Sequence, residues 1–197
     1  MGVYEINEIF VEIIRFHILM SLEQLKFPIG KYQKPDFFSE EIVEKYMADI
    51  ASFPARLRKE VEHLSDEQLD TPYRPDGWTI RQVIHHCADS HMNALIRLKL
   101  ALTEENPIIK PYREELWAES EDSKKMPIQP SLWILEGVHI RWTVLLTSLS
   151  NSDLKRKFTH PEHGLEFTLN ENMGNYAWHC NHHLAHITTL KQNKTWI

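Results

Sequence analysis

The chain has 197 residues, which most simply form one domain with enough length for a sizeable core. A formal net charge of -6 and a pI near 6.0 give no reason to expect a nucleic acid or an anionic membrane as partner. The mean hydropathy is -0.42, and no apolar run approaches the roughly 18 residues that a membrane span requires.

The cysteines and the N-terminal segment bear on the cellular compartment. Cys87 and Cys180 are the only cysteines, and both fall in segments with a helical pattern, which indicates a reducing compartment rather than a disulfide scaffold. The N-terminal segment does not have the pattern of a signal peptide, because charged residues interrupt its apolar stretch: Glu5, Glu8, Glu12 and Arg15. We therefore expect a cytoplasmic protein.

Residues 1–25 have the apolar periodicity of a helix, which ends where Pro28 and Gly30 break it. Met20 lies just before this break. We interpret residues 1–26 as an N-terminal extension, with Met20 as the expected translation start, and residues 27–197 as the domain.

Four long amphipathic segments dominate the domain and predict helices over about 39–64, 79–104, 131–150 and 170–193. Pro54 is expected to kink or split the first of them. Residues 105–130 form a long charged connection, with a short helix predicted at 114–121, and such a connection is often functional. A small hairpin is predicted from 157–160 and 165–168. Helices with polar loops between them predict an all-α fold, a four-helix bundle.

The last predicted helix contains four histidines within eight residues, 179–186. His179 and His183, and likewise His182 and His186, have the i, i+4 spacing that lets two imidazoles on one helix face reach one metal ion. Periodicity places His183 within the apolar stripe and His179 at its edge, whereas His182 should point into solvent. The alternative is a histidine-rich helix end without a ligand role.

The second predicted helix carries His85, His86 and His91. By periodicity His91 lies centrally on its apolar face, which also suits a buried histidine that is hydrogen-bonded to a neighbour. His85 projects about 100° away from His86, so these two cannot share one ion without distortion.

Four stretches together resemble the YfiT family of metal-dependent hydrolases, within the DinB-like superfamily. These stretches are Phe27-Pro28-Ile29-Gly30-Lys31-Tyr32, Asp70-Thr71-Pro72-Tyr73-Arg74, the block from Gly77-Trp78-Thr79 to Met92-Asn93, and Trp178-His179 through His186-Ile187. The likeness runs from about residue 27 to residue 191 in the family's order.

This resemblance implies a DinB-like four-helix bundle with long crossover connections, in a cytoplasmic homodimer. It implies one divalent metal per subunit, held by His86, His179 and His183, with zinc expected and nickel also associated with the fold. His91 is then either a rival ligand or a hydrogen-bonded partner of one.

Three neutral imidazoles leave a metal with open positions, as in catalytic zinc sites. We therefore expect a hydrolase that activates water for attack on a small-molecule substrate. A transferase of a low-molecular-weight thiol, of the bacillithiol type, is the alternative, and a metal-binding bundle without turnover is the third reading. No catalytic acid or base is identified by spacing; Asp89 could orient a ligand imidazole, and Glu171 and Arg141 could approach the site.

Overall fold

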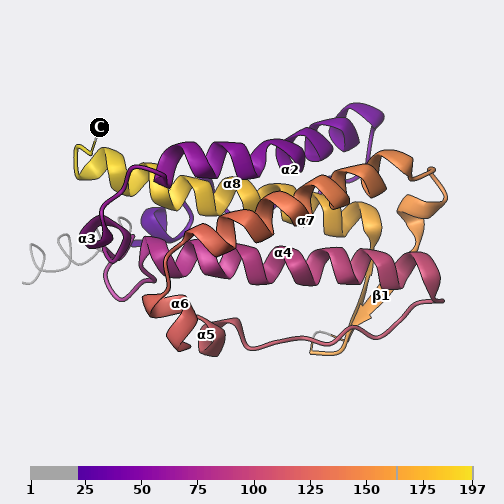
Figure 1. The fold of residues 1–197 in the computed structure, drawn as a ribbon. Helices are drawn as coiled ribbons and strands as arrows, with labels where there is room; N and C mark the ends of the chain where they lie inside the picture. The colour runs from indigo at the N-terminus through magenta and orange to yellow at the C-terminus, as the bar shows by residue number, and fades with distance from the viewer. Residues whose placement is uncertain (1–21, 163, 197) are drawn as a thin grey trace, which may run out of the picture.

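The computed structural model describes residues 22–162 and 164–196. The predicted helix over residues 1–25 and the start at Met20 lie almost entirely outside this range. Within it, four long helices pack side by side along most of their length (Figure 1), namely α2 (Glu40–Val61), α4 (Ile80–Thr103), α7 (Gln129–Ser148) and α8 (Leu169–Asn193). The predicted all-α four-helix bundle is confirmed, and each observed helix agrees with its predicted range to within three residues at either end.

The order of the helices in space differs from a simple up-and-down bundle. Both α7 and α8 pack against α2 and also against α4, so α2 and α4, which follow one another in the chain, lie diagonally opposite. The connection after α4 runs along the outside of the bundle before the chain enters α7 (Figure 1). It is a long crossover of the kind that the resemblance implied.

The shorter elements lie in the connections between the long helices. They are α3 (Asp66–Leu69), α5 (Glu114–Trp117), α6 (Glu121–Lys125), a 3-10 turn η1 (Asp153–Lys155), β1 (Lys157–His160) and β2 (Leu165–Thr168). The two strands form an antiparallel hairpin with Phe158 opposite Phe167, as predicted. The single short helix expected at 114–121 is instead two separate turns of helix, α5 and α6.

The bundle core consists of large apolar side chains from all four long helices, including Phe53, Leu57, Ile84, Leu98, Leu135, Trp142, Met173 and Ile187. Helix α2 continues through Pro54, so the predicted split does not occur. Within the described residues, no helix is both long enough and apolar enough to cross a membrane.

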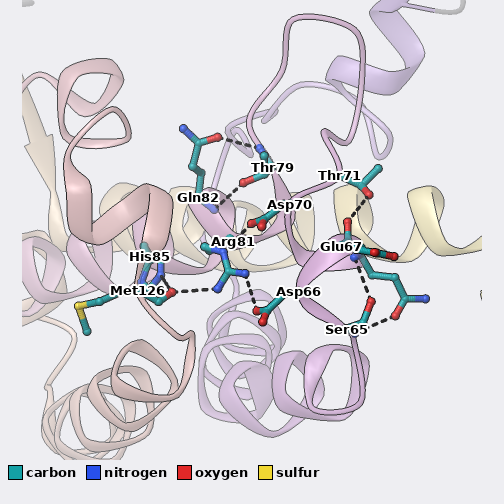
Figure 2. Close-up of polar contacts among 11 residues, drawn as sticks. Ser65, Asp66, Glu67, Asp70, Thr71, Thr79, Arg81, Gln82, His85 and Met126 are labelled. Atoms are coloured by element: carbon teal, nitrogen blue, oxygen red, sulfur yellow. Dashed lines mark hydrogen bonds and ion pairs between the residues drawn. The ribbon is translucent and has the colours of Figure 1, made fainter.

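A polar network fixes the start of α4 (Figure 2). Thr79 caps the helix, and the Gln82 side chain accepts a hydrogen bond from the Thr79 backbone N–H in return. The buried Arg81 guanidinium donates to Asp70 at 2.6 Å, to Asp66 at 2.7 Å and to the Met126 carbonyl at 2.9 Å. Because these contacts join α3, α4 and the segment before α7, they set the position of the helix turn that follows.

Candidate metal centre

Three histidine side chains from two helices converge at one point in the bundle. His86 projects from α4, and His179 and His183 project from successive turns of α8. The Nε2 atom of His179 lies 3.2 Å from the Nε2 atom of His86 and 3.2 Å from that of His183. Two nitrogen ligands about 2.0–2.1 Å from a tetrahedral metal would be about 3.3 Å apart. The spacing of the three nitrogens therefore fits a metal ion between them.

Burial keeps these imidazoles in the form that binds metal. His86 is 4% exposed and His183 is 7% exposed, whereas His179 is partly open to solvent. Desolvation lowers the pKa of His86 to about 4 and holds the pKa values of His179 and His183 well below their usual range. Near neutral pH all three rings are uncharged, and a neutral imidazole has a lone pair to offer.

A chain of hydrogen bonds, which we call the histidine relay, runs from His179 into the core. The Nδ1 atom of His179 lies 3.1 Å from Nε2 of His91, and Nδ1 of His91 lies 2.7 Å from Nε2 of His139. The relay ends where Nδ1 of His139 meets the Ile50 carbonyl oxygen at 2.6 Å.

The carbonyl end of the relay determines the tautomer of every ring in it. A carbonyl oxygen only accepts, so Nδ1 of His139 carries the proton and its Nε2 accepts from His91. Burial lowers the pKa of His139 to about 4 and holds the pKa of His91 well below its usual range, so neither ring is doubly protonated near neutral pH. His91 then donates through Nδ1 and accepts through Nε2 from His179. The Nε2 atom of His179 is left with a lone pair directed at His86 and His183.

His91 does not join the three converging nitrogens, although it lies centrally on the apolar face of α4, as periodicity predicted. It contacts the opposite nitrogen of His179, and its separation of 2.7 Å from His139 is a hydrogen bond rather than the wider spacing of two metal ligands. Cys180 lies close to this pair, but burial raises its thiol pKa well above the usual range. These contacts favour His91 as the partner that orients His179.

His182 is buried, with 7% exposure, so the prediction that it points into solvent is wrong. Its ring stacks on Trp178 at 4.3 Å between centroids and lies 5.8 Å from the ring of Phe27. Trp178 donates to the Gly30 carbonyl at 3.0 Å, and His186 donates to the Lys26 carbonyl at 3.1 Å. The segment that precedes α2 therefore covers this face of α8, which the periodicity of one helix cannot reveal.

The remaining predicted side chains lie away from the three nitrogens or serve other contacts. His85 bonds to Ser131 Oγ at 2.7 Å, in agreement with its predicted direction. Glu171 caps the start of α8 through Thr168 and pairs with Lys34 at 2.9 Å, and Arg141 is exposed. Within residues 22–162 and 164–196, no carboxylate, that of Asp89 included, forms a hydrogen bond with any of the three histidines.

A cavity reaches one of the three histidines, His179. This cavity of about 380 Å³ is lined by His179, Ser90, Tyr112 and Glu114, among others. It adjoins a cavity of about 570 Å³ beneath the β1–β2 hairpin, and both are lined by Arg97, His160, Asn175 and Tyr176. Arg97, Tyr112 and Asn175 were not predicted as site residues. The one sequence signal for them is the length of the connection after α4, which supplies Tyr112.

Comparison with known proteins shows the family of this chain. The family model described as the DinB superfamily matches residues 50–187. The chain belongs to the DinB superfamily. Its solved relative YfiT from Bacillus subtilis, described as a probable metal-dependent hydrolase with an unusual four-helix bundle topology, is 47% identical, with a TM-score of 0.86 over 88% of this chain and 99% of YfiT.

Curated relatives of this DinB protein carry provisional names as metal-dependent hydrolases. One from Oceanobacillus iheyensis is 52% identical over 171 residues, which are 87% of this chain and 98% of the relative. Another, from Bacillus mycoides strain KBAB4, is 49% identical over 175 residues, which are 89% of this chain and the whole of the relative. The resemblance stated from the sequence is thereby confirmed at the level of the family.

Proposed function

We propose that this protein is a metal-dependent hydrolase in which His86, His179 and His183 hold one divalent metal. The observation that carries the proposal is the convergence of three neutral Nε2 atoms at the spacing of metal ligands. The relay supports it, because the hydrogen bond from His179 to His91 leaves the Nε2 lone pair free for an ion. Zinc suits three imidazoles, and nickel is the alternative.

A divalent metal with three imidazole ligands lowers the pKa of a bound water toward about 7 and polarises a carbonyl or phosphoryl oxygen. Side chains of the protein form the substrate cavity next to the metal site. The cavity beside His179 has room for a small-molecule substrate, and Ser90, Tyr112 and Tyr176 place hydroxyl groups along its wall. We assign no catalytic side chain beyond the three ligands.

Transfer of a low-molecular-weight thiol, such as one of the bacillithiol type, is the second candidate. One observation favours it: no carboxylate among the described residues bonds to the three histidines, so none is held against the ligand rings as a ready base for water. A thiol needs no such base, since coordination by a metal is enough to deprotonate it. A metal-binding bundle without turnover is the third candidate, and the cavity beside His179 argues against it.

We further propose that the protein is a cytoplasmic homodimer. Helix α7 presents a row of exposed apolar side chains in Trp133, Ile140 and Val144, with exposures of 62%, 62% and 65%. A row of this kind on one helix is the surface that a second copy would cover. Sedimentation of the protein beside its Val144→Glu variant tests this, and a wild-type monomer would contradict it.

The experiment that tests the function compares zinc-loaded wild type with His183→Ala on two substrate panels. The first contains activated esters, amides and phosphoesters in water, and the second pairs low-molecular-weight thiols with an electrophile. Turnover of the first panel that is lost in His183→Ala supports the hydrolase. Turnover that requires a thiol supports the transferase, and zinc binding without turnover of either panel favours the non-catalytic bundle.

A further inference from the structure

Arg97 carries a positive charge that has no ion pair in the described part of the chain, although it acts electrostatically on Glu114. It lies on α4, and its guanidinium forms no ion pair or hydrogen bond with residues 22–162 or 164–196. Its Nε atom is buried without a partner. A buried donor on a permanent cation is costly to leave unpaired, so such a group suggests that a ligand provides the acceptor.

The position of Arg97 connects it to the metal centre. It lines both the 380 Å³ cavity that reaches His179 and the 570 Å³ cavity beneath the hairpin. A molecule that occupied both cavities would pass Arg97 on its way to the three histidines.

The other charges of the larger cavity are already paired. Lys34 is 2.9 Å from Glu171, and Glu166 is 2.8 Å from Lys157. In the smaller cavity, Glu115 is paired with Arg113 at 3.1 Å. Desolvation raises the pKa of Glu114, and the charge of Arg97 partly offsets that rise. Glu114 and Glu162 line the smaller cavity and not the larger one, so an anion is better placed on the side of Arg97 that faces the larger cavity.

We propose that Arg97 binds a carboxylate at one end of an elongated substrate whose reactive end lies at the metal centre. This inference rests on the proposed metal site. One guanidinium matches one carboxylate in a two-bond contact, whereas a phosphate dianion would exceed the available positive charge. Arg97 follows His86 by eleven residues, or about 16 Å along α4, and its side chain leans back toward the start of the helix. The substrate therefore spans roughly 10 Å between its two ends.

The test uses hydroxamates, which bind zinc through one end of the molecule. A series of dicarboxylic acids, each with one end converted to a hydroxamate, is titrated calorimetrically into zinc-loaded protein, beside the methyl esters of the same compounds. At the chain length that spans the two cavities, the free carboxylate should bind at least about tenfold more tightly than its ester. The preference should disappear in Arg97→Gln and remain in Lys99→Gln, which removes an exposed cation of the same helix that lines neither cavity.

The neutral esters separate the two ways in which the idea can fail. Equal ester affinity in wild type and Arg97→Gln shows that the variant retains its metal centre. Tight ester binding without a carboxylate preference at any chain length, or a preference that survives in Arg97→Gln, overturns the role of Arg97 alone. Esters that do not bind zinc-loaded wild type would overturn the metal centre and the carboxylate site with it.

Discussion

The Nδ1 atom of His91 donates to the Nε2 atom of His139 across 2.7 Å, in a part of the core where neither residue is more than 2% exposed. This bond is the middle of the histidine relay. Because the Ile50 carbonyl can only accept, His139 and His91 each donate through Nδ1 and accept through Nε2, and His179 must donate through Nδ1. A backbone oxygen of α2 thereby determines which nitrogen of an α8 histidine has a free lone pair.

Replacing His139 with Phe should weaken zinc binding about 10–100-fold, the usual cost of losing a partner that orients a metal ligand. The variant fills a similar space but offers no acceptor to His91, so His91 and His179 are free to exchange tautomers. Competition with a chelator measures the affinity. In the ¹⁵N spectrum of histidine-labelled apo protein, the Nδ1-protonated tautomer of His179 should give way to a mixture.

Trp142→Phe is the matched control for this variant. The Trp142 ring lies 5.5 Å from that of His139 and is equally buried, but it takes no part in the relay. It should lower the free energy of unfolding while leaving zinc affinity and the histidine tautomers as in wild type. If both variants lose zinc affinity equally, the effect is one of packing and the relay has no part in orienting His179.

The metal-free protein should lose stability as pH falls from about 6.5 to 4. Burial lowers the pKa values of the clustered histidines, to about 4 for His86, His139 and His186, whereas an unfolded histidine titrates near 6.5. Between these pH values the unfolded chain binds more protons than the folded chain, so the free energy of unfolding rises with pH. The stabilisation from the neutral histidines is fully present above about pH 6.5. Each such histidine adds up to about 1.4 kcal/mol per pH unit to the slope of the free energy of unfolding against pH.

Urea unfolding at several pH values between 4.5 and 7.5 measures this slope. His139→Phe should reduce it by up to about 1.4 kcal/mol per pH unit, because one buried titrating ring is gone, and Trp142→Phe should leave it unchanged. A wild-type stability that does not vary over this range would show that the histidines are not buried in their neutral form.

Arg81→Leu should lower the free energy of unfolding by about 3 kcal/mol, because it removes three hydrogen bonds that join α3, α4 and the segment before α7. Arg113→Leu is the control, since its ion pair with Glu115 lies on the surface and should be worth less than about 1 kcal/mol. Equal losses in the two variants would mean that the Arg81 network does not anchor α4.

Much of the fold is readable from the sequence because its signals are local. The apolar period of each long helix and the hairpin around 161–164 depend on neighbouring residues, and their bounds agree closely with the structure. The diagonal placement of α2 and α4 was implied only by the resemblance, since no local pattern encodes it.

The candidate site was predicted in part, and its errors have a common cause. The i, i+4 spacing fitted two histidine pairs, and apolar periodicity favoured His179 and His183, which converge with His86 in the structure. His182 was misplaced because the segment covering it is about 150 residues away in the chain. His139, Arg97 and Asn175 were overlooked as site residues for the same reason, since contacts between helices far apart in sequence determine their roles.

The measurement that tests the central claim most directly is the metal content of purified wild type, His183→Ala and His182→Ala. His182 and His183 are adjacent, equally buried histidines, but only His183 directs Nε2 to His179. We predict close to one zinc or nickel ion per chain in wild type and His182→Ala, and almost none in His183→Ala. Loss of metal in His182→Ala with retention in His183→Ala, or no metal in any of the three after reconstitution, would contradict the account.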